Sequence, residues 1–375
     1  MTVPNRALRA DPLIENQFLL TSRERVMRAR SDMRLGLPVV VVAGPGEAAM
    51  LLAVEGLSAA RFGAAVQAER AEFVLTGRRA LALGLEGAAP VVRLDLAGLS
   101  FAQVQRLADP VLDGALRGLV GVPVLPGGAV QEAGIALARA AQLLPAVVSV
   151  PLADAGRVAR DQGLTLVSAG DVLTELVQMA AHHEVSAAAL PMAVSAAGRV
   201  HVFRPDDGGA EHYAIEVGEV DPVGPVLVRL HSACFTGDVL GSRKCDCGPQ
   251  LQAAMAAMAE VGGGVLLYLN QEGRGIGLAN KMRAYTLQER GLDTVEANHH
   301  LGFEDDERDF RIGAALLARM GISEVRLMTN NPAKVAMLTA QGVRVAERVP
   351  LAVGRTAQNT RYLAVKAQKS GHILP

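Results

Sequence analysis

Residues 234–248 read Cys-Phe-Thr-Gly-Asp-Val-Leu-Gly-Ser-Arg-Lys-Cys-Asp-Cys-Gly and contain every cysteine of the chain. Cys245 and Cys247 are two positions apart, so in extended backbone their side chains point to the same side and can share one ion. Cys234 must return from a separate turn, which the two glycines of the segment make easy. The segment therefore predicts a metal site held by Cys234, Cys245 and Cys247.

The number of cysteines indicates the type of site. A structural zinc ion normally has four protein ligands, whereas a catalytic one has three and leaves a position for water or substrate. Three cysteines favour the catalytic type, and the main alternative is a structural site completed by a histidine such as His231. Buried apolar cysteines, or a disulfide with a spare thiol, are further alternatives. The odd count, without a secretion-like segment, argues against the disulfide.

Length and composition limit the class of protein. The 375 residues leave room for two domains, half of the residues are hydrophobic, and the formal net charge is -1. This charge and an aromatic content of 3% argue against nucleic acid as the main partner. No apolar run approaches the ~20 residues that cross a membrane, and the N-terminus lacks the apolar part of a signal peptide. We expect a cytoplasmic protein with no membrane partner.

The N-terminal half alternates helix and strand signals without a cluster of reactive groups. It predicts a domain over residues 1–195, and the fold class predicted for the chain is α/β (α+β), with two domains that are each a mixed sheet flanked by helices. No His or Cys precedes His182, and the acidic residues come singly, so no catalytic site is expected there. His182 and His183 are predicted to end a surface helix, and residues 184–209 to form a linker. The expected strands and helices cover residues 38–43, 72–75, 90–95, 129–143 and 146–150.

An arginine cluster lies on the first expected helix. We predict that it is a solvated helix face, and the alternative is a contact with phosphate or with the other domain. Its members are Arg23, Arg25, Arg28, Arg30 and Arg34.

The C-terminal half, residues 200–375, carries two more motifs. A strand over 265–269 runs into Gln271-Glu272-Gly273-Arg274-Gly275-Ile276-Gly277 before a helix, and such a glycine-rich turn lets backbone approach an anion. Arg274 and Lys281 favour a phosphate there. Thr329-Asn330-Asn331-Pro332 follows another strand and precedes a helix with Lys334 in its first turn. A lysine there opposes the helix dipole, so we expect it to face a ligand.

Residues 296–309 have no clean period and are crowded with histidines and acids around Arg308. Helix capping explains one of these acids and leaves the others without a structural role.

Together these phrases resemble GTP cyclohydrolase II, in its order and spacing, from about Val200 to Leu374. The resemblance implies hydrolysis of GTP to 2,5-diamino-6-ribosylamino-4(3H)-pyrimidinone 5′-phosphate, formate and pyrophosphate, the first step of riboflavin biosynthesis. The phrases are Arg229-Leu230-His231-Ser232, Thr236-Gly237-Asp238, Cys245-Asp246-Cys247-Gly248, Gln271-Glu272-Gly273-Arg274, Asp306-Glu307-Arg308-Asp309-Phe310 and Thr329-Asn330-Asn331-Pro332.

The resemblance also implies roles. The three cysteines match the ligands of one zinc ion per subunit, which activates water. Asp306 matches the proton acceptor, Arg308 a proposed nucleophile and Tyr285 an active-site tyrosine. Arginine stays protonated, so stabilising charge is an equally physical role for Arg308. Mg²⁺ on the triphosphate and a homodimer are implied too. The positions that hold the nucleotide are Arg229, Leu230, His231, Ser232, Gln250, Glu272, Gly273, Arg274, Thr294, Thr329 and Lys334, with Glu272 suited to guanine.

The N-terminal half distantly resembles 3,4-dihydroxy-2-butanone 4-phosphate synthase, for example in Gly127-Gly128-Ala129-Val130-Gln131-Glu132-Ala133. The acidic Mg²⁺-binding loop of that family is missing from residues 43–54, and its Gly-His-Thr-Glu phrase has lost the histidine. The resemblance therefore predicts a degenerate, non-catalytic domain, and the alternative is an unrelated scaffold or dimerisation domain.

Two departures from the cyclohydrolase pattern lie beside the metal segment. Ala233 stands where Glu is common, and Arg243-Lys244 replaces Leu-Arg. They bear on affinity and rate more than on the type of reaction. Two alternative functions stay open: a cyclohydrolase-like enzyme of another pathway such as pyrimidine catabolism, and a non-catalytic guanine-nucleotide-binding regulator.

Overall fold

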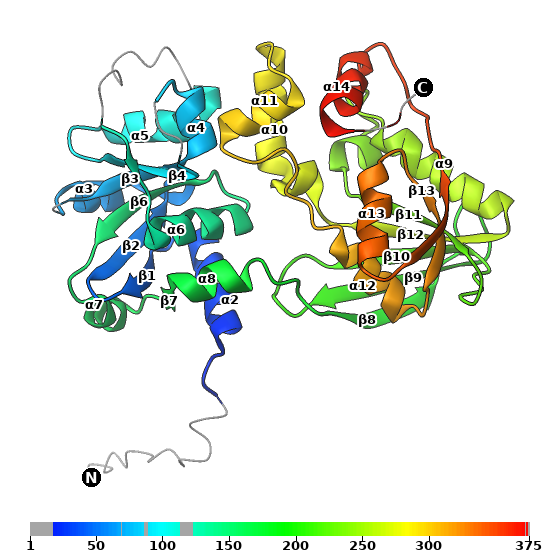
Figure 1. Cartoon of the computed structure of the whole chain (residues 1–375), viewed down its shortest axis with the longest axis horizontal. Coiled ribbons are helices and arrows are strands. Elements are labelled where there is room, and N and C mark those ends of the chain that lie inside the picture. The colour runs from blue at the N-terminus through cyan, green and yellow to red at the C-terminus, as the bar shows by residue number, and fades with distance from the viewer. Residues whose placement is uncertain (1–17, 69, 86–88, 113–122, 372, 374–375) are drawn as a thin grey trace, which may run out of the picture.

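The computed structural model describes residues 18–68, 70–85, 89–112, 123–371 and 373. Two layered halves lie side by side, and each is built on a seven-stranded mixed sheet with helices against it (Figure 1). The predicted fold class, α/β with two domains that are each a mixed sheet flanked by helices, is confirmed. No helix of the described ranges is both long and apolar enough to cross a bilayer.

The first sheet is antiparallel except where β1 pairs with β7. Val74 packs into the core with α2 and α6, whereas its neighbours Phe73 and Leu75 pack into the core on the other face, as strand alternation requires. In spatial order the strands are β5 (Leu125–Pro126), β4 (Val91–Asp95), β3 (Glu72–Thr76), β6 (Ala146–Pro151), β2 (Glu47–Ala53), β1 (Val39–Gly44) and β7 (Leu166–Ser168).

The helices of this half are short and capped. α2 (Ser22–Arg34) begins with a capping box between Thr21 and Glu24. The others are α3 (Ala59–Val66), α4 (Gly77–Ala82), α5 (Phe101–Ala108), α6 (Ala129–Ala140), α7 (Ala155–Gln162) and α8 (Ala169–Glu175), with short turns η1 (Val54–Gly56) and η2 (Pro110–Leu112).

The second sheet is parallel on one side and antiparallel on the other. β14, β13, β11 and β12 run parallel, and β12, β10, β9 and β8 run antiparallel. The carboxyl ends of neighbouring parallel strands therefore meet at one edge, where ligands bind in open α/β sheets. In spatial order the strands are β14 (Arg344–Val349), β13 (Glu324–Met328), β11 (Val226–Ser232), β12 (Gly263–Leu269), β10 (His212–Gly218), β9 (Gly198–Pro205) and β8 (His182–Ala189).

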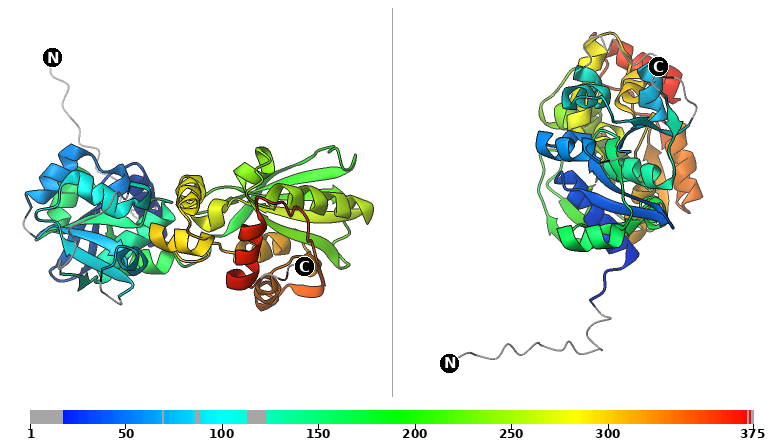
Figure 2. Two further views of the ribbon diagram at one scale, coloured as in Figure 1. Left: turned by 90° about the horizontal axis from the view of Figure 1, so that it is seen from above. Right: turned by 90° about the vertical axis from the view of Figure 1, so that its left-hand side faces the viewer.

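Two helices of the second half, α10 (Gly277–Glu289) and α11 (Thr294–Leu301), lie between the halves (Figure 2). Their apolar residues, such as Ala284 and Leu287, share a cluster with Leu144 of the first half. Arg283 of α10 pairs with Asp109 at 2.9 Å and with Glu55 at 3.3 Å. The remaining helices are α9 (Cys247–Glu260), α12 (Arg311–Arg319), α13 (Pro332–Ala340) and α14 (Thr360–Ser370), with the short turns η3 (Phe235–Val239) and η4 (Glu272–Gly275).

Three local predictions are wrong. Residues 184–209 hold most of β8 and β9 and are not a linker, and His182 and His183 lie in β8 rather than at the end of a helix. The solvated arginine face is wrong for Arg23 and Arg30, which contact the other half of the chain through Asp206 and Asp207.

Candidate active site

The carboxyl ends of β11, β12 and β13 border a cavity that gathers the predicted residues. Asp306 alone is absent from its wall and lies behind Arg308, to which it is hydrogen-bonded. The predicted residues in the wall are Arg229, Leu230, His231, Ser232, Cys234, Cys245, Cys247, Gln250, Glu272, Gly273, Arg274, Tyr285, Thr294, Arg308, Thr329 and Lys334.

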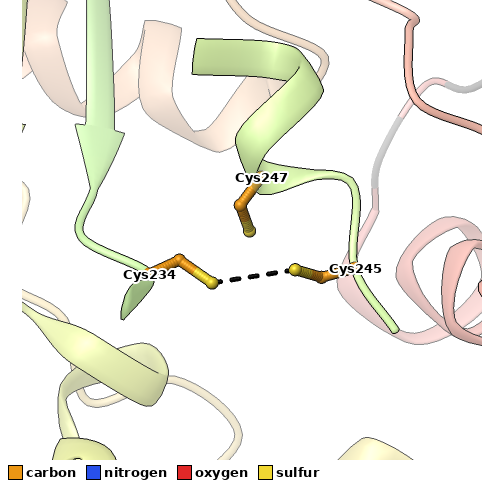
Figure 3. A group of neighbouring side chains, drawn as sticks. All are labelled: Cys234, Cys245 and Cys247. Atoms are coloured by element: carbon orange, nitrogen blue, oxygen red, sulfur yellow. Dashed lines mark hydrogen bonds between the residues drawn. The ribbon is translucent and has the colours of Figure 1, made fainter. Parts of the chain in front are cut away.

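The three cysteines converge just beyond β11 and at the start of α9 (Figure 3). Their sulfurs all lie within 4.8 Å of one another, and those of Cys234 and Cys245 are 3.7 Å apart. Tetrahedral zinc holds thiolate sulfurs about 3.8 Å apart, given Zn–S bonds of about 2.3 Å. The cluster therefore fits zinc. In the described part of the chain it is the one group of three or more metal-binding side chains, and His231 does not belong to it.

Gly237 leaves the space that the sulfurs occupy. A Cβ atom at this position would lie 2.9 Å from Sγ of Cys245 and 3.1 Å from Sγ of Cys234. Real Cβ contacts are rarely so short, so any side chain here would push the sulfurs apart.

Lys281 is buried beside the cluster. Its Nζ donates to Cys234 Sγ at 3.1 Å, Thr236 Oγ1 at 2.8 Å and Glu272 Oε1 at 2.9 Å. Hydrogen bonds from Cys245 and Cys247, helped by the Lys281 ammonium, lower the pKa of Cys234, which favours the thiolate that metals bind. Lys281 was expected to favour a phosphate. The structure instead places its ammonium group in contact with the metal-binding segment.

Asp238 joins three elements of the site, and sequence reasoning assigned it no role. Its carboxylate accepts from the backbone N–H of Cys234 at 3.0 Å, from His231 Nε2 at 3.0 Å and from the Tyr268 hydroxyl at 2.9 Å. Burial lowers the pKa of His231, so the ring is neutral and donates Nε2–H. The Thr-Gly-Asp phrase of residues 236–238 was the sequence signal that could have pointed to Asp238.

Arg308 and Lys334 form a cationic wall of the cavity. The Arg308 guanidinium and the Lys334 ammonium lie 4.7 and 4.6 Å from the ring of Phe310. Arg308 also donates to Ser232 Oγ at 3.3 Å and, through Nε, to Asp306 at 2.8 Å. Burial would raise the pKa of Asp306, but Arg308 more than offsets it and lowers that pKa.

Two buried polar groups complete this wall. Arg229 donates to the Met328 carbonyl at 3.3 Å and also to Gln250. Burial lowers the pKa of Arg229 to about 10, so the guanidinium remains charged at neutral pH. Thr329 Oγ1 accepts from the N–H of Asn331 at 3.0 Å, which fixes the turn before α13.

The turn after β12 is built from left-handed backbone. Gly273, Arg274 and Gly275 have φ of 63°, 62° and 93°, and such a conformation strains the one residue that is not glycine. The Glu272 carboxylate ties the turn to the metal segment, because it accepts from the N–H of Phe235 at 2.6 Å as well as from Lys281. Burial raises the pKa of Tyr285 to about 12, so its phenol is a neutral donor.

Comparison with known proteins agrees with this geometry. The family model described as GTP cyclohydrolase II matches residues 182–350. GTP cyclohydrolase-2 of Azospirillum brasilense is 42% identical over 359 residues, 93% of each chain. The chain belongs to the GTP cyclohydrolase II family. GTP cyclohydrolase-2 of Pseudomonas paraeruginosa is 57% identical over 175 residues, 47% of this chain and 85% of that one.

Among solved structures, the comparison found a two-domain 3,4-dihydroxy-2-butanone 4-phosphate synthase from A. baumannii. It is 17% identical, with a TM-score of 0.31, over 81% of this chain and 93% of the other. A likeness this low decides nothing about the N-terminal half, whose resemblance to that synthase stays a prediction.

The departures from the GTP cyclohydrolase II pattern leave the cysteine cluster intact. The N–H of Ala233 donates to the Leu269 carbonyl at 2.8 Å, and Lys244 pairs with Glu289 at 2.7 Å. A residue outside the motifs shared with the family also supports the cysteine cluster. Fully buried Asn359, which precedes α14, donates to the carbonyl of Cys245 at 3.4 Å. Sequence reasoning missed it, because no pattern links positions so far apart.

Proposed function

We propose that this hydrolase of the GTP cyclohydrolase II family converts GTP to 2,5-diamino-6-ribosylamino-4(3H)-pyrimidinone 5′-phosphate, formate and pyrophosphate. The family implies the first step of riboflavin biosynthesis. The observation that carries the proposal is one cavity in which three clustered cysteines share the wall with the paired cations Arg308 and Lys334. A nucleotide needs both, since the ring is opened at one end and the phosphates are held at the other.

Cys234, Cys245 and Cys247 would hold one zinc ion per subunit. Bound zinc supplies Lewis acidity, which makes water nucleophilic at neutral pH. The protein prepares this site itself: Lys281 stabilises the Cys234 thiolate, and Asp238 fixes the backbone of the same residue.

The remaining wall would bind GTP. Arg308, Lys334, Arg229 and Thr329 offer donors to the triphosphate oxygens, and Mg²⁺ would accompany the triphosphate. Glu272 can recognise guanine through few bonds, because protein donors already use three of the roughly four acceptor positions of a carboxylate. The other wall residues that hold the nucleotide would be Leu230, His231, Ser232, Gln250, Gly273, Arg274 and Thr294.

Asp306, Arg308 and Tyr285 are the proposed catalytic residues. Asp306 is kept as a carboxylate by Arg308, so it is ready to accept a proton. The same ion pair holds a proton on Arg308, which supports charge stabilisation rather than nucleophilic attack. Tyr285, neutral because of its raised pKa, can donate a hydrogen bond to water or to a leaving group.

We propose a non-catalytic role for the N-terminal domain, and a division of the chain between α8 and β8, ahead of the predicted 195–200. Two of its acids are occupied: Glu72 pairs with Arg93 at 2.6 Å and accepts from Gln131 at 3.2 Å. Glu55 accepts from the N–H of Leu144 and pairs with Arg283. A cytoplasmic homodimer completes the proposal.

The test is mass spectrometry of the products after zinc-loaded protein meets GTP and Mg²⁺, with ribulose 5-phosphate in a parallel tube. We expect formate, the diaminopyrimidinone monophosphate and unconsumed sugar. A ring-opened product of another mass would indicate a different pathway. Unchanged GTP, in protein shown to hold zinc and bind GTP, would refute the enzyme and favour a regulator.

A further inference from the structure

A second cavity lies between the two halves of the chain. The first half contributes the face of α2 that carries Arg30 and Arg34, and the stretch after α8. The second half contributes His182 of β8, His212 of β10 and the loops that hold Gln271 and Arg311. Figure 1 shows α8 leading directly to β8 at this junction.

Two buried groups in its wall lack a hydrogen bond of ordinary geometry. No hydrogen bond of ordinary geometry reaches either ring nitrogen of His182 within the described ranges, although the residue is only 3% exposed and its ring lies near the Ala180 backbone. Oε1 of Gln271, which is 8% exposed, likewise lacks such a hydrogen bond. Buried polar groups are costly unless hydrogen-bonded, so groups of this kind around one cavity point to a ligand.

The charge of the wall favours an anion. It holds three guanidinium groups and two carboxylates. Arg30 neutralises Asp207 at 3.4 Å and Arg311 neutralises Asp309 at 2.7 Å, whereas Arg34 donates to a backbone carbonyl. One positive charge is left over.

The tautomer of His212 argues against a metal ion. Its Nδ1 accepts the N–H of Asn270 at 3.0 Å, so the proton of the neutral ring is on Nε2. This nitrogen is a donor and cannot ligate a metal. The cavity therefore presents N–H donors from histidine and arginine, and its free acceptors include the Gln271 oxygen and the unprotonated ring nitrogen of His182.

We propose that this cavity binds a small phosphate-bearing compound with at least one hydroxyl group, and that its occupancy changes turnover at the active site. The phosphate oxygens accept from Arg34, His182 and His212, and the hydroxyl donates to Gln271 Oε1. Both fill hydrogen bonds that the protein leaves open.

Gln271 carries the coupling. It lines both cavities, and its Nε2 donates to the Asp309 carbonyl at 2.7 Å. Gln271 precedes the Glu272 turn and Asp309 follows Arg308, so a ligand that moves or fixes Gln271 acts on both sides of the active site.

The test is calorimetric titration of the full-length, zinc-loaded protein with glycerol 3-phosphate and, separately, with inorganic phosphate. We expect glycerol 3-phosphate to bind more tightly, and His182→Phe and Arg34→Met to weaken it about tenfold, a typical loss for one charge-assisted contact. Lys334→Met, in the active site, is the matched control and should keep this binding. Equal affinities of the wild type and both cavity variants would refute the site.

Turnover of GTP tests the coupling. Without added phosphates, His182→Phe should hydrolyse GTP at the wild-type rate, which also shows that it folds. Glycerol 3-phosphate should change the wild-type rate even at saturating GTP, and leave the rate of His182→Phe unchanged. Binding with no change in the wild-type rate would refute the coupling, and an effect that GTP abolishes would place the compound in the active site instead.

Discussion

The two halves of the molecule have sheets of the same size and use their polar residues in opposite ways. In the described part of the first sheet only β1 and β7 run parallel, at its border, and acids such as Glu72 are tied up in ion pairs. In the second, four neighbouring strands run parallel, so their carboxyl ends carry side chains to a common edge. Strand direction, rather than sheet size, decides which half has a cavity fit for chemistry.

The largest expected effect tests whether chemistry is confined to the second sheet. Cys245→Ser should lose bound zinc and lower GTP turnover by at least about 10³-fold, because the metal supplies the nucleophile. Metal analysis and product formation measure both. Glu72→Gln, in the first sheet, should change neither; a comparable loss there would break the comparison.

Arg308→Met sharpens the role assigned to the cationic wall. Turnover should fall about 10²-fold or more, as for loss of a charge-stabilising group. Arg308 lowers the pKa of Asp306. In the variant, burial still raises this pKa and only the more distant Arg274 opposes it, so the acid limb of the pH–rate profile should move to higher pH. Asp306→Asn should lack this limb. An unshifted limb in Arg308→Met would mean that another group titrates.

Gly237→Ala tests the space inside the cysteine cluster. The added Cβ meets two sulfurs at about 3 Å, so zinc affinity should fall about 10- to 100-fold. Competition with a chelator measures it. Gly224→Ala, where a Cβ meets nothing within 4 Å, is the control. Unchanged affinity in Gly237→Ala would show that the cluster tolerates expansion.

The antiparallel side of the second sheet lies outside the candidate active site and carries a histidine whose protonation should change stability. Burial, with the neighbouring His182, lowers the pKa of His212 to about 4, and only Asp207 opposes this. Between pH 6.5 and 4 the unfolded chain binds a proton that the folded chain does not. The free energy of unfolding should therefore decrease as the pH is lowered, by about 1 kcal/mol per pH unit in this window.

Urea unfolding at several pH values measures this slope. His212→Gln, which keeps an acceptor for Asn270, should flatten it by the same amount. An unchanged slope in the variant would assign the titration to other groups.

The smallest effect concerns the contact between the halves. Arg283→Met removes the ion pairs of α10 with Glu55 and Asp109, and should cost about 0.5–1 kcal/mol of stability. Because α10 also carries Lys281 and Tyr285, we expect a several-fold loss in kcat/KM. Arg157→Met, which breaks an exposed pair with Asp161, is the matched control and should have no effect on either. Unaltered kinetics in Arg283→Met would mean that α10 holds its position without the first half.

Much of the cavity wall that forms the candidate active site could be predicted, because its residues lie close together in sequence. Cys245 and Cys247, and the turn at Gly273, sit in short segments whose spacing carries the chemistry. Contacts made only in three dimensions could not be predicted, such as Asp238 with Tyr268 or Asn359 with Cys245.

The strands that were missed have a similar cause. β8 is rich in alanine and shows no alternation, and pairing with β9 imposes its extended form. β2 was not among the expected strands, although it directly follows the Gly-Pro-Gly turn of residues 44–46, which closes a hairpin between β1 and β2.

The path of β8 has a practical consequence for dissecting the chain. A C-terminal fragment that starts at residue 200 would lack β8 and leave β9 as a bare edge, with unpaired N–H and C=O groups that invite strands of other molecules. A fragment that starts near residue 178 keeps the edge covered. The first should aggregate on expression and the second should remain dispersed, so the same domain could be judged unstable or sound according to where it is cut.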